Sequence, residues 1–549
     1  MKTACNRQKL HISVGLGLIL GACGARGVPG ESQDDHRPNI LFVVADDLGY
    51  SDLGAFGGEI NTPTIDALAE GGLRLTNFHA TPECSPTRAM LMSGVDNHIA
   101  GIGVPGPSEE MQRHPGYEGY LNFRVVALPE LLRDAGYHTY MTGKWHLGLD
   151  HDTSPAARGF ESSFALLSGS ADHFMIRSTN RRNPISPYHE NDAKLESLPD
   201  DFYSTKFYAD KLIEYIDANI EDGKPFFGWL AYTAPHWPLQ APEDFIDRYA
   251  GKYDEGYDVL RDQRIGRMKA MGLLPDDVDL SSIVPVDPAW HELDAETQKM
   301  SSRKMEIYAA MVENLDYHFG RVVQYLKDVD EFENTFIVFL SDNGADGSNR
   351  DERRVTNFVR DNSYENLGRP DSWTSYGAGW AHAASAAYKF RKGYVSEGGI
   401  RVPAIVYHES VADKGETNDQ FLTILDIVPT FLSLADTTHP GDTYHDRSVM
   451  PLQGKSFLPL IKGDSEPTHP SNEAQGWEVE GDRAMIKGPW KLLWLAAEHG
   501  AAEWELYNLE NDPAELTNLA GERPEVLEDM LQSWREYVEH NGVVIQESL

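Results

Sequence analysis

Cysteine is scarce in this chain, with only three among 549 residues. Cys5 and Cys23 lie within the first 23 residues, which leaves Cys84 as the one cysteine in the remainder of the sequence. A single internal cysteine excludes a framework of disulfides. We therefore expect Cys84 to be present for its chemistry and not as a cross-link.

Basic residues are also in short supply. The 48 lysines and arginines face 86 aspartates and glutamates, which gives a formal net charge of -38. A nucleic-acid partner is excluded, because phosphate binding needs a basic surface. Any site for an anion must gather lysine, arginine, histidine or metal locally, since the rest of the surface would repel it.

Apolar runs long enough to span a membrane are missing. The run from Ile12 to Leu20 follows three basic residues and is far shorter than the ~20 residues that a membrane span needs. This pattern predicts an export signal over residues 1–22 that does not join the folded domain.

The predicted signal ends at Leu20-Gly21-Ala22-Cys23, which resembles the bacterial lipobox, in which the cysteine is lipidated. The alternative is an ordinary signal peptide cleaved near Ala22 or Ala25. We expect an exported protein that is periplasmic, or a lipoprotein at the outer membrane or cell surface of a bacterium.

The length and pattern of the chain predict a large domain followed by a smaller one. A polar linker over 23–37 precedes a domain over 38–440, and a Pro/Gly/Asp-rich stretch near 440 separates it from a C-terminal subdomain over 441–549. In the subdomain we expect two tryptophan-bearing strands, 490–495 and 504–509, and a final helix. Residues 250–298 read as an irregular insertion, and 350–387 as a loop whose aromatic residues could line a pocket.

Two buried strands end in oxygen-bearing side chains. The apolar run 38–45 ends in Asp46-Asp47, and the run 334–340 ends in Ser341-Asp342-Asn343-Gly344. Open α/β sheets bind ligands at the carboxyl ends of their strands. Buried carboxylates there are costly unless a positive group meets them, so the pattern predicts a cation site; an exposed turn is the alternative.

Two further expected strands deliver histidine. The strand 136–142 leads into Gly143-Lys144-Trp145-His146, and the strand 225–232 leads into Pro235-His236-Trp237-Pro238. Prolines restrict their own φ and the residue before them, so His236 should be held in a stiff loop. Rigid presentation of a histidine beyond a strand suits proton transfer.

The stretch from Cys84 to Gly94 places a cysteine where a helix should begin, with Pro86 and Arg88 following. Free N–H groups at a helix start favour an anion. A phosphatase loop of the form Cys-x5-Arg is excluded, because residue 90 is Met and the arginine comes two positions too early.

Taken together, C-x-P-x-R followed by leucine, a small residue and glycine, and G-Y-x-T-x-x-x-G-K-W-H over 136–146, resemble the two signatures of type I sulfatases. The likeness is closest to bacterial arylsulfatases. Ser93 and Thr142 depart mildly from the usual pattern. The resemblance implies the alkaline-phosphatase-like fold: a large mixed, mostly parallel sheet between helices, plus a small C-terminal antiparallel sheet with a packed helix.

The resemblance also implies the site residues. A maturation enzyme would oxidise Cys84 to formylglycine (3-oxoalanine). Lys392, preferred to Lys389 by its spacing from Gly398-Gly399, would contact sulfate. The implied metal ligands are Asp46, Asp47, Cys84, Asp342 and Asn343, the implied catalytic residues are Cys84, Arg88, Lys144, His146, His236 and Lys392, and the implied substrate-binding residues are Lys144, His236 and Lys392. Carboxylate and amide oxygens favour Ca²⁺, with Mg²⁺ second.

The implied reaction is the hydrolysis of a sulfate monoester, small or glycan-borne, by a hydroxyl of the hydrated formylglycine. His236 would protonate the departing alcohol, and His146 would assist the release of sulfate. A phosphate or phosphonate monoester hydrolase of the same superfamily is one alternative. A non-catalytic lipoprotein that binds sulfated glycans is the other.

Overall fold

The computed structural model describes residues 37–177, 185–278, 280, 286, 288–351 and 360–545. The predicted signal over 1–22 and the lipobox cysteine Cys23 lie outside the described residues. Within the described part, no helix combines the length and the apolar character that crossing a membrane requires.

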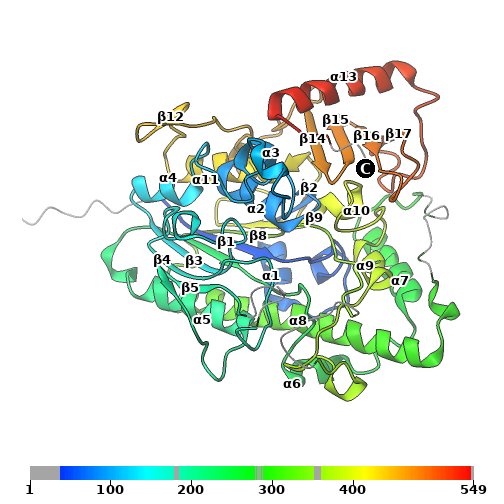
Figure 1. Ribbon diagram of the computed structural model, residues 1–549, viewed down its shortest axis with the longest axis horizontal. Helices are drawn as coiled ribbons and strands as arrows, with labels where there is room; N and C mark the ends of the chain where they lie inside the picture. The colour runs from blue at the N-terminus through cyan, green and yellow to red at the C-terminus, as the bar shows by residue number, and fades with distance from the viewer. Residues whose placement is uncertain are drawn as a thin grey trace, which may run out of the picture. The chain divides into compact units, whose positions relative to one another are not determined.

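The main feature is a mixed sheet of eleven strands (Figure 1). Its central strands run parallel, whereas β9 is antiparallel to both of its neighbours. The order is β10 (Thr417–Asn418), β2 (Leu73–His79), β9 (Arg401–Tyr407), β8 (Thr335–Ser341), β1 (Asn39–Ala45), β7 (Phe226–Ala231), β3 (His138–Lys144), β4 (Ser162–Leu166), β5 (Tyr188–Glu190) and β6 (Ala193–Lys194), with β11 (Leu422–Thr423) also paired to β2.

The central strand β1 shows why the sheet is buried on both faces. Its side chains alternate between two cores: Leu41 and Val43 join one, and Ile40, Phe42 and Val44 join the other. Successive side chains of a strand point to opposite faces, so an uninterrupted apolar run needs cover on both. The continuous run in the sequence therefore predicted a central strand correctly.

Helices supply that cover (Figure 1). One face packs against α1 (Pro63–Gly71), α5 (Ser204–Asp217), α6 (Glu243–Ile246), α7 (Tyr257–Ala270), α8 (Ala295–Asp328) and α9 (Ala378–Ser385). The other packs against α2 (Cys84–Ser93), α3 (Asn97–Ala100), α4 (Leu128–Asp134), α11 (Ile427–Leu434) and α12 (Leu458–Ile461). The mixed sheet between helices confirms the fold that the family resemblance implied.

Two segments are more regular than predicted. The expected irregular insertion 250–298 contains α7, a helix of fourteen residues, because Tyr257, Leu260 and Met268 form a narrow buried stripe. Its other faces are polar enough to hide that periodicity. The expected loop 350–387 contains α9, and Trp380 on that helix is fully buried against Tyr257.

The C-terminal part contains an antiparallel sheet of four strands: β14 (Ala474–Val479), β15 (Asp482–Lys487), β16 (Trp490–Trp494) and β17 (Trp504–Asn508). The sequence predicted only the last two. Helix α13 (Pro524–Asn541) packs on this sheet and ends at Gly542, whose φ of 68° fits the left-handed cap. A small hairpin, β12 (Thr443–Tyr444) and β13 (Arg447–Ser448), precedes the sheet, and α10 (Glu397–Ile400) leads into β9.

Candidate active site

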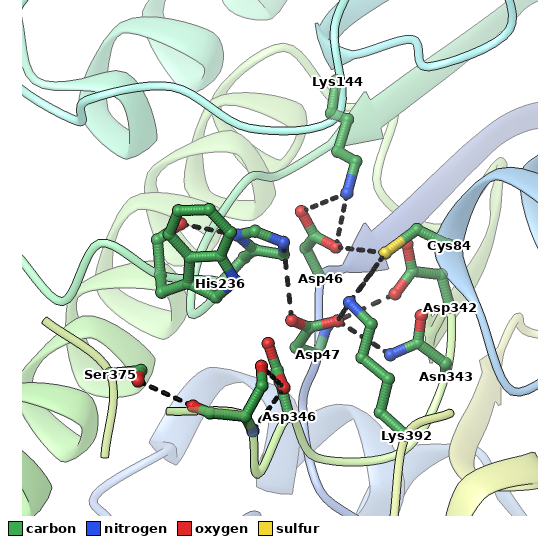
Figure 2. Close-up of polar contacts among 12 residues, drawn as sticks. Asp46, Asp47, Cys84, Lys144, His236, Asp342, Asn343, Asp346, Ser375 and Lys392 are labelled. Atoms are coloured by element: carbon green, nitrogen blue, oxygen red, sulfur yellow. Dashed lines mark hydrogen bonds and ion pairs between the residues drawn. The ribbon is translucent and has the colours of Figure 1, made fainter. Parts of the chain in front are cut away.

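The acidic strand ends meet at one edge of the main sheet. Strands β1 and β8 are parallel neighbours, with Ala45 opposite Ser341, so Asp46 and Asp47 emerge beside Asp342. Asn343 Nδ2 donates to Asp47 Oδ1 at 2.8 Å, and Asp47 N–H donates to Asp342 Oδ1 at 3.3 Å. The structure therefore brings the predicted oxygen ligands together (Figure 2).

Cys84 is the first residue of α2 and points at these carboxylates. Its thiol donates to Asp46 Oδ1 at 3.4 Å, and Lys392 Nζ donates to Sγ at 3.1 Å. Burial raises the pKa of the Cys84 thiol well above its usual value, and Lys144 and Lys392 offset only part of this shift. Burial thus outweighs the two lysines, and the thiol stays protonated.

Three cations face the three carboxylates. Lys144 Nζ donates to both oxygens of Asp46 at 2.8 Å, and Lys392 Nζ donates to Asp47 Oδ1 at 2.6 Å. The Arg88 guanidinium meets Asp342 Oδ2 through Nε at 2.9 Å and Nη2 at 2.8 Å. We call Asp46, Asp47, Cys84, Arg88, Lys144, Asp342, Asn343 and Lys392 the site cluster.

Buried charges are tolerated only when they are paired. Asp46, Arg88, Lys144 and Asp342 have no exposed surface, and Asp47 is 1% exposed. Burial raises the pKa of the Asp46 carboxyl to about 7, while Lys144 opposes the shift. The pairing of lysine or arginine with every carboxylate is thus what keeps this edge of the sheet stable.

Gly143 of the second motif occupies a position that requires glycine. Its φ is 109°, and a Cβ on it would lie 1.8 Å from the Ala231 carbonyl oxygen of β7. Only glycine permits this approach. The close packing of β3 on β7 sets where Lys144, the next residue and the last of β3, points.

The two predicted histidines lie at the same edge. His236 follows β7; its Nδ1 donates to the Trp237 carbonyl at 2.6 Å, so Nε2 is the nitrogen that faces Asp47 Oδ2, at 3.7 Å. His146 follows β3 with a φ of 58°, and its Nδ1 is buried without a hydrogen-bond partner among the described residues. Burial, with Lys144 nearby, holds the pKa of His146 well below its usual value, and the ring is neutral.

One group of side chains in the described part is compact enough to hold a metal ion. The potential ligand atoms of Asp46, Asp47, Cys84 and His236 all lie within 4.8 Å of one another. Asp342 lies outside this group, and its oxygens accept hydrogen bonds from Arg88 and from the Asp47 amide. His236 was predicted as a proton donor and not as a ligand, so this grouping differs from the predicted set.

Sequence reasoning overlooked two acidic residues near the site. Glu83 directly precedes Cys84, and burial raises the pKa of its carboxyl to about 7 against the effect of Lys392. Asp346 lies with His236 and Tyr376 around a small cavity beside Asp47. In the sequence, Glu83 and Asp346 could have been assigned to the site only because they stand next to Cys84 and shortly after Asn343.

The aromatic residues of the 350–387 segment are mostly packed in the interior. Trp373 and Trp380 are fully buried, and Tyr376 stacks on Tyr308 with ring centroids 4.4 Å apart. Only Tyr376 of the three lines the small cavity beside His236. Of the three aromatic residues that we considered for a pocket, one therefore lines this cavity, together with Trp237 and Tyr308 from other segments.

Family models match most of this chain. The model for the sulfatase family matches residues 38–437. A second, described as the C-terminal part of N-sulphoglucosamine sulphohydrolase, matches residues 387–539. Together they cover the main sheet, the site cluster and the four-stranded sheet.

Relatives agree with the family models. An uncharacterised sulfatase of Schizosaccharomyces pombe is 45% identical over 93% of this chain and 95% of its own length. An arylsulfatase of Klebsiella aerogenes is 36% identical over 82% of this chain and 96% of its own length. The crystal structure of a sulfatase from Pseudoalteromonas sp. superimposes with a TM-score of 0.60 at 21% identity, covering 92% of this chain and 90% of that one, which shows the fold.

Proposed function

The chain belongs to the sulfatase family, and we propose that it hydrolyses sulfate monoesters with a formylglycine made from Cys84 and a bound calcium ion. The observation that supports this most directly is the site cluster, where Cys84 contacts Asp46 and Asp47 at the carboxyl edge of a buried sheet and a cation pairs with each of the three carboxylates. The name of the Klebsiella relative makes aryl sulfates the first substrates to try.

The side chains at this edge fit a divalent cation. Asp47 Oδ2 and Asn343 Oδ1 are both buried without a hydrogen-bond partner among the described residues, although buried oxygens are normally paired. Carboxylate and amide oxygens are hard donors that suit Ca²⁺, and Mg²⁺ less well because it demands stricter geometry. We assign Asp46, Asp47, Asp342 and Asn343, with residue 84, as the residues that would hold calcium.

The charge balance of the site cluster supports the same assignment. Its three carboxylates and three cations cancel, so the protein alone offers no net attraction to an anion. The chain as a whole, with a formal charge of -38, repels one. A divalent cation would make the site positive locally, which is what binding of a sulfate ester needs.

The cofactor groups supply two things when present: calcium polarises sulfate oxygens, and formylglycine provides a hydrated aldehyde at position 84 as the nucleophile. The remaining tasks belong to ordinary side chains. Arg88 orients Asp342 and also donates from Nη1 to the Lys144 carbonyl at 2.8 Å, which fixes the end of β3. Lys144 and Lys392 are the donors that we assign to the sulfate oxygens.

Proton transfers fall to the two histidines. His236 is held by its Nδ1, which leaves Nε2 to pass a proton to the departing alcohol oxygen. Burial, Lys392 and Lys144 hold the pKa of His236 well below its usual value, so it carries that proton only when the negative ester offsets the lysines. His146, neutral and with an unpaired Nδ1, is placed to accept a proton as sulfate is released.

Export and lipidation form a separate part of the proposal. The basic start, the short apolar run and the Leu20-Gly21-Ala22-Cys23 sequence support secretion and anchoring through Cys23. We infer a periplasmic or surface-bound lipoprotein with its catalytic part in the aqueous phase.

The test uses the full chain expressed together with a formylglycine-generating enzyme. Hydrolysis of 4-nitrophenyl sulfate should exceed that of 4-nitrophenyl phosphate, and a hydrazide probe should label the peptide that contains residue 84 in proportion to activity. Turnover of sulfate by protein whose Cys84 is fully alkylated by a thiol reagent would refute the formylglycine mechanism. A preference for the phosphate ester would favour the alternative hydrolase.

A further inference from the structure

The loop that carries Lys392 is held from two sides. On the site side, Lys392 N–H donates to the Ala345 carbonyl at 3.1 Å, and Gly393 N–H donates to the Pro82 carbonyl at 2.9 Å. On the other side, Lys389 Nζ donates to the Tyr507 hydroxyl of β17 at 3.1 Å. The four-stranded sheet therefore contacts the same loop that places Lys392 in the site cluster.

Glu397, which begins α10 just after this loop, joins several segments. Its carboxylate accepts from Lys491 Nζ of β16 at 2.8 Å and bonds His79 Nε2 of β2 at 3.1 Å. Its backbone N–H donates to Glu515 Oε2 at 2.8 Å, and Lys491 Nζ also lies 2.8 Å from Glu515 Oε1. We call His79, Glu397, Arg401, Lys491 and Glu515 the junction cluster.

The junction cluster also touches the segment that leads to Cys84. His79 is the last residue of β2. The next residue, Ala80, donates from its N–H to the Ile400 carbonyl at 2.7 Å and accepts from Trp477 Nε1 of β14 at 2.8 Å. The chain then reaches Cys84 within four residues. One cluster thus fixes the approaches to both Cys84 and Lys392.

Lys491 is the only cation that the four-stranded sheet contributes to this cluster. Its side chain, like those of Glu397 and His79, has no exposed surface. Burial alone would raise the pKa of Glu397, but Lys491 and His79 hold it well below its ordinary value. Without Lys491, the remaining permanent positive charge near the Glu397 carboxylate is that of Arg401, whose Nη1 lies 3.4 Å from Glu397 Oε2. A buried carboxylate that loses its main partner draws in water or moves.

Apolar packing joins the same parts. Val395 and Ile400 share a core with Trp477, Leu493 and Tyr507 of the four-stranded sheet. This packing makes the loop and the sheet one unit, so a disturbance at Lys491 reaches the loop directly and does not require the protein to unfold.

We propose that Lys491 is a positioning residue for the reaction. Its ammonium group, through Glu397, holds the Lys392 loop and the segment that leads from His79 to Cys84 in place at the site cluster. The inference rests on the function proposed above for Lys392 and residue 84. Lys491 itself touches neither residue in the structure, so its influence on the reaction runs through Glu397.

Lys491→Met tests this, because methionine fills similar space without charge. We expect kcat for 4-nitrophenyl sulfate to fall about tenfold to a hundredfold with KM little changed, since sub-ångström to ångström misplacement of reacting groups costs this much. Hydrogen exchange followed by mass spectrometry should accelerate in residues 79–84 and 389–396, and not in β1. Lys491→Arg, which keeps the charge, should restore part of kcat.

Lys487→Met is the matched control. Lys487 ends the neighbouring strand β15, and its Nζ pairs with Asp529 Oδ2 of α13 at 2.7 Å, away from the junction cluster. It should leave kcat and exchange in 389–396 unchanged. If Lys491→Met is too unstable to purify, Glu515→Gln, which keeps an acceptor for the Glu397 N–H, should show the same local pattern to a smaller degree.

The proposal is overturned if both junction variants keep wild-type kcat, or if exchange rises evenly along the main sheet, which would mark a purely structural role. The exchange measurement does not depend on activity. If the wild type hydrolyses no sulfate ester, the proposed function fails, and exchange still decides whether Lys491 holds the loop.

Discussion

The site cluster and the junction cluster are both buried groups of carboxylates and cations, and they differ in what their oxygens do. In the junction, Lys491 Nζ lies 2.8 Å from a carboxylate oxygen of both Glu397 and Glu515, and Glu397 also meets His79 Nε2 at 3.1 Å. At the site cluster, the potential ligand atoms of Asp46, Asp47 and Cys84, together with one of His236, all lie within 4.8 Å of one another. Charge pairing alone therefore does not identify a catalytic site; potential ligand atoms of several side chains close enough to share one ion do.

The two clusters also differ in how costly their loss should be for function. The junction cluster holds segments in place, so its disruption should displace the reacting groups and lower activity only in part. A site supplies reacting groups and metal ligands, so its disruption should remove activity outright. The following experiments separate the two on that basis.

Replacing the nucleophile position should have the largest effect. Cys84→Ala removes the group that we propose to be oxidised, and turnover of 4-nitrophenyl sulfate should fall by on the order of a million-fold, the lower range of enzymatic acceleration. The variant should stay folded by circular dichroism and still respond to calcium. Retained turnover above a hundredth of wild type would place the nucleophile elsewhere.

Removing a proposed metal ligand should come next. Asp342→Ala leaves the Arg88 guanidinium buried without its main partner, which should cost about 3–5 kcal/mol of unfolding free energy. Calcium at a hundredfold excess over its Kd should add about 2.7 kcal/mol to the unfolding free energy of the wild type and so raise its melting temperature. Asp342→Ala should reduce this rise in melting temperature.

Lys491→Met provides the contrast. Loss of the Lys491 charge should lower the melting temperature by the same amount with and without calcium, because the junction cluster is not proposed to bind the metal. Extensive EDTA treatment of the wild type gives the complementary measurement. If it strips all metal and leaves both rate and melting temperature unaltered, then the assignment of calcium to the site cluster is wrong.

A third buried ionic group should respond to pH. His98 of α3 lies between Asp96, 2.8 Å from Nδ1, and Glu478 of β14, 3.2 Å from Nε2, beside Tyr537 of α13. Burial would lower its pKa, but these carboxylates raise the pKa of His98 to about 9 from 6.5. Because the folded pKa is the higher one, the stabilisation is complete below pH 6.5 and is lost as pH rises to about 9.

The loss should amount to at most about 3 kcal/mol of unfolding free energy between those pH values. Urea unfolding at several pH values measures it, with His98→Gln as the comparison. The variant should lose the slope over this window. An equal slope in both proteins would show that His98 titrates normally.

The smallest kinetic effect is expected at the N-terminus. Cys23→Ser should move the protein from membrane to soluble fractions, and kcat and KM for 4-nitrophenyl sulfate should not change, because the anchor precedes the folded part. A wild-type N-terminus that begins beyond Cys23 and carries no acyl mass would contradict the lipoprotein proposal.

Several features of the fold followed from local patterns. The continuous run of β1 had to be buried on both faces, and its carboxyl end had to carry Asp46 and Asp47 to a sheet edge. The start of a helix at Cys84 could also be predicted from the residues next to it. Helix α7 was not found, because only one narrow stripe of it is apolar, and β14 and β15 were not found, because their short runs follow a polar turn-rich stretch.

The sequence by itself determined which residue types stand at the strand ends, that Cys84 has no disulfide partner, and the family signatures around Cys84 and Lys144. Spacing already favoured Lys392 over Lys389, and only the tertiary structure decided what each lysine contacts: Lys392 Nζ meets Cys84 Sγ across a separation of 308 residues, while Lys389 Nζ meets the Tyr507 hydroxyl. It also decided that Lys491 joins Glu397. Such pairings depend on the order of strands in the sheet and on the packing of the C-terminal sheet against α10, and neither is encoded in the spacing of nearby residues.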